Sequence, residues 1–555
     1  MLAADFFAGH QYCDVNPYNT ELEDYTPPFD YMERGVYNRI APLVETRIAN
    51  FKSLDFLMEV HPATGEVSDY EKSLVATRLL SQTQYKCGFA DKLDNLILWS
   101  ELCGTAFLLS WWDRNAGDAV RIGERRVPLG DLDFGVLTPY EVLPESIYKE
   151  NLDDQSSVIL EQVVRVEEVD RRFGVRVKPC RAETLGITPA AGVGGFGYVG
   201  TTFGMTTRTA ENSTLLRTYL ERANARYPSG RMIIATPDRI LYYGTLPIDG
   251  YPLAVLRCKR VPGMFFGRSV IEDLIPLQRA YNGVKNKLHD YIRSLSLNPL
   301  LVPEGSVSDV DELAQNGVAP GDIVEYDPTR GEPKPLSAPQ MPSGIFEECD
   351  NLAREMEYVA GLSHLGATGN SQSTLTSATA IERLREIDGV RLALTGDNIR
   401  AAILAAAKIW LKLYRAHGGV THIEHMVGSY DTAATFTWCA DDLNSYDVVF
   451  ESENALLHSD ETQLAAIRTG IELGLFAGED GKIPRSVRKK LLCRMHIGDF
   501  VRTLYEDELQ NAAARRENLR LMQGEALSVG ICDDHELHLA AHRRAALDYA
   551  YETLR

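Results

Sequence analysis

Two long amphipathic helical patterns, separated by a proline-rich segment, constrain the fold of this chain more than any other feature. In residues 268–295, apolar side chains recur at steps of three and four residues, as on one face of an α-helix. The second pattern covers residues 345–361 and stops at Gly361, a residue suited to a helix end. The intervening residues 296–344 contain eight prolines, which exclude a continuous helix. Because apolar residues also recur there, we expect a small compact insertion between two helices.

A loop and a third, longer helical pattern follow directly. Residues 362–376 are rich in Gly, Ser and Thr and predict a loop. Residues 377–417 carry an apolar stripe that includes Ile399, Ile403 and Trp410, and a single helix of this length would span about 60 Å. No side chain in residues 267–417 stands in a pattern typical of a catalytic group. The order of these parts predicts a mechanical frame.

The rest of the chain predicts a mixed α+β fold. Residues 31–59 and 68–112 show helical spacing of apolar residues, so both are predicted to be helical. Short runs with strand-like alternation and turn residues between them fill most of residues 119–257. Strands are expected again after Gly419, and helices from residue 459 onward.

Composition excludes several classes of protein. At 555 residues the chain exceeds what one core supports, and we expect two to four domains. The net charge of -21 argues against wrapping nucleic acid, which requires an excess of Lys and Arg; it suits either solubility or a wall that DNA does not adhere to. Nine scattered cysteines indicate a reducing compartment. The N-terminus does not resemble a secretory signal, and we expect no membrane span.

The glycine-rich residues 186–204 resemble a nucleotide-binding motif only superficially. They contain G-x-G-x-x-G twice, but such a site needs a strand before the glycines and a helix after them. Here Pro189 precedes the glycines and a polar segment follows. A loop or an extended hairpin is therefore favoured over a dinucleotide site.

Three histidines near the C-terminus form the other candidate for chemistry. His535, His538 and His542 fall near one face of a helix and could hold zinc, although the H-E-x-x-H pattern of a metalloprotease is lacking. The alternative is that they are ordinary surface or interface histidines. The sequence also lacks a P-loop and a G-x-S-x-G elbow. We therefore predict no catalytic residue, no cofactor and no metal, and expect that the protein is not an enzyme.

Several segments resemble the portal proteins of tailed bacteriophages. GRSVIEDLIPLQRAYN is similar to the start of the stem helix in that family, and LCGTAFLLSWWD and LTPYEVLPES resemble its wing. YDVVFESENALLHSDETQLAAIRTGIELGLF and DDHELHLAAH resemble its C-terminal region. Each motif is weak alone, but their order is more specific, and the resemblance covers most of residues 31–545.

The resemblance implies a portal-like α+β fold with an α/β wing, a two-helix stem, a small α/β clip insertion, a long wing helix and a short helical C-terminal crown. The implied parts are an N-terminal arm (1–30), the first part of the wing (31–266), stem helix 1 (267–295), the clip (296–344), stem helix 2 (345–361), the tunnel loop (362–376), the second part of the wing (377–458) and the C-terminal helical region (459–555).

The resemblance also implies a function and partners. Portals form a ring, usually of twelve subunits, at one capsid vertex, and genomic DNA is packaged and ejected through its channel. The implied partners are further copies of this chain, double-stranded DNA, the terminase large subunit, a head–tail adaptor, and the major capsid and scaffold proteins, with no membrane. The protein would reside in the virion, and in the host cytoplasm during assembly. The alternatives are a neck or baseplate ring protein without DNA contact, and a metal- or nucleotide-dependent enzyme.

Candidate site residues follow from this assignment. Basic residues of the first helix could face DNA phosphates and would be multiplied in a ring, while small polar residues of the loop suit a segment near a sliding polymer. The DNA-channel candidates are Lys285, Lys287, Arg293, Ser363, His364, Thr368, Asn370, Ser371, Gln372, Ser373 and Thr374. The candidates for the interface between clip and adaptor are Glu304, Asp309, Asp322, Glu325 and Tyr326.

Overall fold

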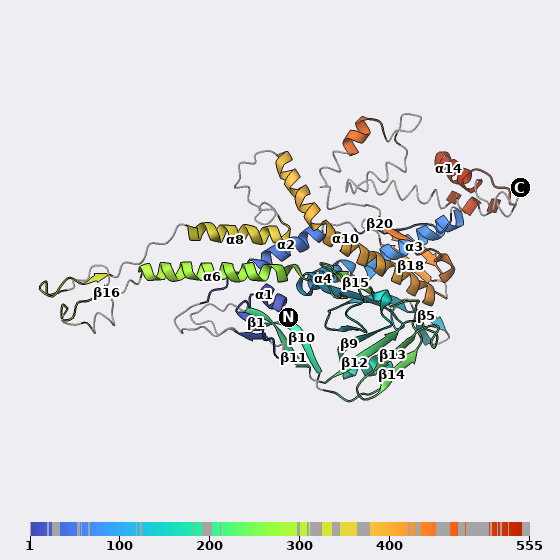
Figure 1. The fold of residues 1–555 in the computed structure, drawn as a ribbon. Coiled ribbons are helices and arrows are strands. Elements are labelled where there is room, and N and C mark those ends of the chain that lie inside the picture. Colours follow the sequence, from blue (N-terminus) through green and yellow to red (C-terminus); the bar gives the residue numbers. More distant parts are fainter. Residues whose placement is uncertain are drawn as a thin grey trace. The chain divides into compact units, whose positions relative to one another are not determined.

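The chain has a mixed α+β fold, as its patterning predicted, and divides into two units (Figure 1). Unit 1 comprises Met1–Leu43, Thr188–Gly204 and Ile271–Ala360, and unit 2 comprises Val44–Ile187, Met205–Val270 and Gly361–Arg555. The computed structural model describes residues 2–18, 22–24, 34–52, 56, 58–64, 67–117, 119–122, 125–180, 182–190, 202–210, 212–296, 300–307, 310, 325–335, 344–362, 378–419, 422–427, 433–450, 467–475, 483, 510, 513–514, 516–518, 520–521, 524–530 and 532–546.

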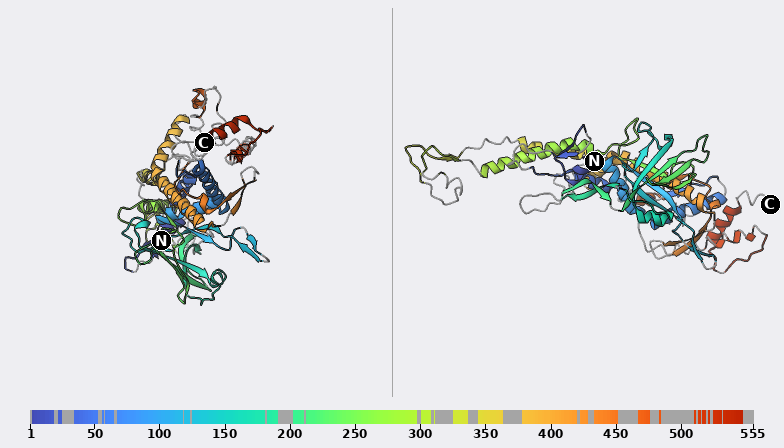
Figure 2. Two further views of the ribbon diagram at one scale, coloured as in Figure 1. Left: turned by 90° about the vertical axis from the view of Figure 1, so that its right-hand side faces the viewer. Right: turned by 90° about the horizontal axis from the view of Figure 1, so that it is seen from below.

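Two antiparallel sheets share a core in unit 2. The larger sheet has the order β14-β13-β12-β9-β8, and its strands lie side by side in Figures 1 and 2. The smaller has the order β15-β4-β7. Phe107, Leu160 and Phe265 belong to one buried cluster that draws on both sheets. The bounds of these strands are β4 Thr105–Asp113, β7 Asp131–Leu137, β8 Val142–Pro144, β9 Ser157–Arg165, β12 Ser213–Glu221, β13 Arg231–Ala235, β14 Ile240–Gly244 and β15 Leu253–Arg257.

The predicted helix over residues 68–112 is wrong at its C-terminal end, where residues 105–112 belong to a strand. Helices α3 (Val67–Lys86) and α4 (Phe89–Cys103) are followed by strand β4. Gly104 ends α4 with a φ of 79°, a left-handed conformation that glycine adopts without strain. The residues after it are aromatic and aliphatic and buried on both faces of the strand, so their apolar run carries no alternation that would distinguish a strand from a helix.

The predicted helix over residues 31–59 is likewise shorter than expected. Helix α2 covers Ile40–Lys52, and residues 58–60 form strand β3 (Met58–Val60), which pairs with β20 (Val448–Phe450). Asn38 sets the start of α2, since its Oδ1 accepts hydrogen bonds from the backbone N–H of Ile40 (3.1 Å) and Ala41 (3.3 Å).

The long helix α10 (Ala378–His417) confirms the prediction for residues 377–417 and packs against β4 and β15. Its Trp410 is fully buried, stacks on Phe134 with ring centroids 4.7 Å apart, and donates from Nε1 to Ser110 Oγ at 2.9 Å. The apolar stripe predicted from the sequence is therefore the face of α10 that packs against the smaller sheet. Strands β18 (His422–Val427) and β19 (Ala433–Trp438) form a hairpin after it.

In unit 1, helices α6 (Val270–Ser296) and α8 (Gly344–Ala360) match the two predicted helices to within two residues at each end. They pack together through a cluster that includes Tyr281, Cys349 and Leu352 (Figure 1). Of the segment between them, the described residues include the short pair β16 (Leu300–Leu301) and β17 (Lys334–Pro335). The N-terminal residues form α1 (Leu2–Ala8), β1 (Cys13–Val15) and β2 (Leu22–Asp24).

Smaller elements complete the described residues. Strands β10 (Ala182–Ala190) and β11 (Thr202–Ala210) pair on either side of the glycine-rich segment, whose residues 191–201 lie outside the described ranges. A strand therefore follows the glycines, where a dinucleotide site would need a helix. The other elements are β5 (Ala119–Ile122), β6 (Arg125–Pro128), α5 (Val166–Phe173) and α14 (His535–Ala546). None of the helices in the described ranges is long and apolar enough to cross a membrane.

Candidate functional site

Helix α6, which bears the basic channel candidates, presents three different faces. It is 27 residues long, about 40 Å. One face carries the apolar residues that meet α8, among them Leu277, Tyr281 and Val284. The second carries three amide side chains, and the third is exposed.

The amide face consists of Gln278, Asn282 and Asn286, here called the amide column. These residues are four positions apart and so lie one above another on the helix. Gln278 is fully buried and Asn282 is 2% exposed, so both amides need hydrogen-bond partners inside the protein.

The partners are backbone groups of residues 35–39, which belong to neither a helix nor a strand. Gln278 accepts from Arg39 N at 3.0 Å and donates to Tyr37 O at 2.9 Å. Asn282 accepts from Tyr37 N at 3.1 Å, and Asn286 accepts from Gly35 N at 3.0 Å and donates to Gly35 O at 3.1 Å.

The spacing of the two segments explains this register. Four helix residues rise about 6 Å, and alternate residues of a stretched chain are about 6.6 Å apart. The amide column therefore pairs with alternate residues of the segment, much as a strand would. Gln278 and Asn282 belong to the LQRAYN part of the stem-like motif, and their hydrogen bonds to the backbone of residues 35–39 were not predicted from it. A repeat of amides at four-residue spacing was the available signal.

Lys285 and Lys287 do not share a face. They are two positions apart, which places their side chains about 200° apart around the helix. Lys285 is half-buried, with Nζ 5.7 Å from the centre of the Tyr281 ring, whereas Lys287 is exposed. Arg293 lies on the last turns of α6, and its side chain lies outside the described part of the structure.

The exposed face of α6 is a strip of residues three and four positions apart, here called the exposed strip. Lys287 lies on it between small residues on one side and an acidic residue on the other. The strip consists of Glu272, Pro276, Ala280, Gly283, Lys287 and Asp290. Its small side chains would let another surface approach the helix backbone closely.

The candidates of the clip and of the loop are described only in part. Glu304, Glu325 and Tyr326 are exposed, and Tyr326 forms a β-bridge with Val307. Asp309 and Asp322 lie outside the described residues. So do all eight loop candidates, Ser363, His364, Thr368, Asn370, Ser371, Gln372, Ser373 and Thr374.

Two of the three C-terminal histidines lie together. His538 and His542, one turn apart on α14, share Glu517, with His538 Nδ1 3.1 Å and His542 Nε2 3.4 Å from Glu517 Oε2. His538 Nε2 faces Gln510 Oε1 at 3.0 Å, and this amide is oriented by its donation to Cys532 O at 2.8 Å. His535 is exposed and outside this group. Helical spacing predicted the histidine pair, but not the carboxylate between them.

A groove of about 340 Å³ lies beside α10 in unit 2. Arg257, Arg260, Lys408 and Lys412 contribute positive charge to it. None of the described residues that line it is Ser, Thr, Cys or His, the side chains that most often act as nucleophile or base. Asp153 and Asp249 line it as well, so charges of both signs meet in the groove.

Comparison with known families identifies the class of protein. Residues 145–417, about half of the chain, match the family model described as Phage P22-like portal protein. This range contains α6, α8 and α10 together with strands β9 to β15. No curated protein matches the chain.

The chain therefore belongs to the phage portal proteins, structural components of the head–tail connector in bacteriophage virions. Within them, its match is to the P22-like portal family. The resemblance drawn from the sequence motifs is confirmed. Membership also implies an oligomeric assembly at a vertex of the phage head.

Proposed function

We propose that this portal protein forms a ring, of twelve subunits, whose central channel carries the genome during packaging and ejection. The observation that carries the proposal is the order of elements within the matched range. A long helix, an insertion, a second helix packed against the first, and a 40-residue helix follow one another. Such a frame suits a conduit, which needs rigid walls and no reactive pocket.

The parts of the ring follow from this order. Helices α6 and α8 are the stem, residues 296–344 the clip, residues 362–376 the tunnel loop, and α10 with the two sheets the wing. Residues 459–555 form a short helical crown region. The clip, through Glu304, Asp309, Asp322, Glu325 and Tyr326, is the platform for the terminase large subunit and the head–tail adaptor. The capsid and scaffold proteins are the partners of the outer parts.

DNA contact in the channel is proposed for the loop candidates and for the basic residues of α6. Among the latter, the exposure of Lys287 favours it over the half-buried Lys285, whose Nζ lies 5.7 Å from the centre of the Tyr281 ring. A ring repeats Lys287 once per subunit, but Asp290 lies one turn away on the same exposed strip. Such balanced charge, together with a net charge of -21 per chain, suits a wall along which DNA slides without adhering.

Electron microscopy of the purified full-length protein tests the assembly. Rings with a central channel as wide as a DNA duplex, about 20 Å or more, are expected. A protein that remains a discrete monomer, or one that binds and hydrolyses ATP, would overturn the proposal.

A loop variant separates a portal from a neck or baseplate ring. Deletion of residues 364–373 is expected to leave ring assembly intact and to impair packaging or retention of DNA. Replacement of the same ten residues by Gly and Ser is the matched control for loop length. Normal packaging by the deletion variant would place the DNA-contacting loop elsewhere.

A further inference from the structure

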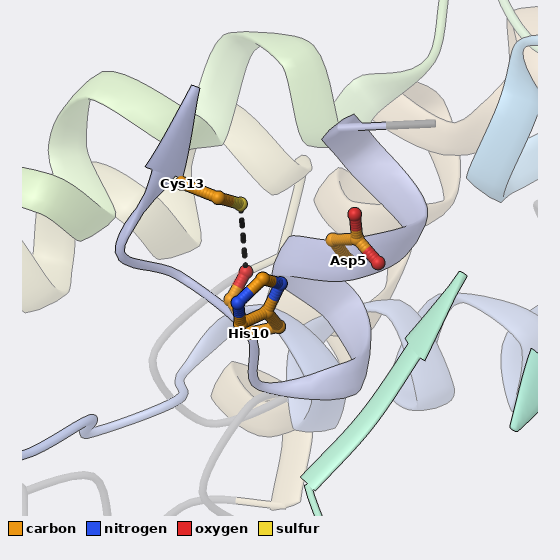
Figure 3. Close-up of side chains that lie close together, drawn as sticks. All are labelled: Asp5, His10 and Cys13. Atoms are coloured by element: carbon orange, nitrogen blue, oxygen red, sulfur yellow. Dashed lines mark hydrogen bonds between the residues drawn. The ribbon is translucent and has the colours of Figure 1, made fainter. Parts of the chain in front are cut away.

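A group of metal-ligand side chains lies in the N-terminal residues 2–24, here called the N-terminal hook. Figure 3 shows Asp5 of α1, His10 after it and Cys13 at the start of β1 close to one another. One ligand atom from each of the three residues lies within 4.8 Å of the other two. The carboxylate, imidazole and thiol of these residues are all ligand types that zinc accepts.

Local backbone geometry brings these residues together. Gly9 has a φ of 98°, which lets the chain reverse direction directly after α1. The reversal is held by the backbone N–H of His10, which donates to Asp5 O at 2.9 Å. Asp5, His10 and Cys13 thereby meet on one side of the hook, although they are five and three positions apart in sequence.

The β1–β2 pairing adds a carboxylate that holds the imidazole of this group. Its register places Asp24 directly opposite Cys13. Asp24 Oδ1 lies 2.8 Å from His10 Nε2, so its carboxylate orients the His10 ring from the second strand. Asp5 and Cys13 are 2% and 0% exposed, while His10 and Asp24 are on the solvent side and leave an entry path.

The electrostatic environment of this group favours a cation. The charged groups that act on the Cys13 thiol are the carboxylates of Asp5, Asp14 and Asp24 and, against them, the guanidinium of Arg279. In the structure Cys13 Sγ donates to the carbonyl oxygen of His10 at 3.3 Å, a weak hydrogen bond. A divalent cation would compensate the clustered negative charge and displace the thiol proton to solvent as the metal–sulfur bond forms.

We propose that Asp5, His10 and Cys13 bind zinc or a similar divalent transition-metal ion, with Asp24 orienting the imidazole of His10. One carboxylate, one thiolate and one neutral imidazole supply three protein ligands, and a water molecule would complete a tetrahedral shell. The ion would link helix α1 to strand β1 and so stabilise the hook.

The hook is fastened to α6, so the ion would stabilise that contact. Asn282 Nδ2 donates to Gln11 Oε1 at 2.7 Å, and Arg279 Nη2 donates to Cys13 O at 2.9 Å. Both contacts involve residues between or beside the ligands. Ion binding would therefore restrict the motion of the hook, the segment that is hydrogen-bonded to α6.

The C-terminal group of Glu517, His538 and His542 is a weaker candidate. Both ring nitrogens of each histidine there already face an oxygen acceptor, and His538 is held by an oriented amide. An ion would have to displace these contacts, and the group contains no thiol.

Spectroscopy with cobalt tests the proposal on the full-length protein. After treatment with a chelator, Co²⁺ is expected to bind one equivalent per chain and to produce thiolate-to-cobalt charge-transfer absorption, and added Zn²⁺ should abolish this absorption. Cys13→Ser should lose the absorption. Cys532→Ser, at an exposed cysteine, and the double variant His538→Ala/His542→Ala should retain it.

A second variant tests the site without the risk that Cys13→Ser fails to fold. Asp24→Asn changes a side chain that is 72% exposed, and it should weaken Co²⁺ binding by about tenfold or more. Absence of charge-transfer absorption in the wild-type protein, its persistence in Cys13→Ser, or unchanged affinity in Asp24→Asn would each overturn the proposal.

Discussion

Arg47 and Glu101 form a buried, two-point ion pair that joins helix α2 to helix α4. Arg47 Nε lies 3.0 Å from Glu101 Oε2, and Arg47 Nη2 lies 3.1 Å from Glu101 Oε1. The two side chains are 4% and 0% exposed. Cys258 Sγ donates to Glu101 Oε1 at 3.5 Å, and the carbonyl of Cys258 receives hydrogen bonds from Thr395 and Asn398 of α10. The pair is thus the centre of a polar network that links helices α2, α4 and α10.

Removing one partner of this pair should destabilise unit 2 strongly. Glu101→Gln or Arg47→Met leaves the other charge buried without compensation, and we expect a loss of about 3–5 kcal/mol. The loss of stability in the double variant should be smaller than the sum of the losses in the two single variants. Lys52→Ala, at the partly exposed pair with Asp94, is the control and should change stability by about 1 kcal/mol or less. Chemical denaturation of the wild type and these four variants measures the free energy of unfolding. Equal losses for the buried and the exposed pair would contradict the prediction.

The amide column predicts where α6 is coupled to the N-terminal chain. Asn282→Ala removes the acceptor of Tyr37 N–H and the donor to Gln11, so we expect a loss of about 2–4 kcal/mol in local stability. Hydrogen exchange at residues 34–39, followed by mass spectrometry, should accelerate. Ala280→Ser, on the exposed strip of the same helix, should leave exchange there unchanged. Unaltered protection in Asn282→Ala would show that the column does not hold this segment.

The environment of His417 predicts that the stability of unit 2 depends on pH. Its ring stacks on Trp112 at 5.1 Å, and burial, followed by the nearby Arg114, lowers the pKa of His417 below its ordinary value of 6.5. Between the lowered value and about 6.5 the unfolded chain binds more protons than the folded chain, so this contribution to stability is lost as pH falls.

Thermal unfolding between about pH 7.5 and 5 measures this effect. His417→Phe keeps an aromatic stack and should lose less stability on acidification than the wild type. His535→Gln, at an exposed histidine, should behave as the wild type does. An identical loss in wild type and His417→Phe would contradict the assignment.

The separation of Lys285 and Lys287 around α6 predicts different effects on DNA handling. If the exposed strip lines the channel, Lys287→Ala should change packaging rate or DNA retention, with an effect that weakens as salt screens the charges. Lys285→Ala should affect helix packing against Tyr281 instead, with little change in DNA handling at equal ring yield. Equal, salt-dependent packaging defects in the two variants would mean that both lysines reach DNA.

The limits of sequence reasoning are visible in particular segments. Residues 105–113 have a buried apolar run that suits either a helix or a strand, and pairing with β7 and β15 decided the latter. The candidate zinc ligands Asp5, His10 and Cys13 were not recognised, because they meet only through the reversal of the chain at Gly9. Similarly, Glu517 reaches His538 from 21 positions away in sequence.

The sequence by itself determined α6, α8 and α10 and, through the order of its motifs, the portal family. Helical periodicity is a local property, since each turn places its own side chains on one face. Tertiary structure alone decided what those faces meet: the amide column on residues 35–39, Trp410 on Phe134, and Arg47 on Glu101. Such contacts join residues tens or hundreds of positions apart, and their geometry depends on how whole elements pack rather than on any local pattern.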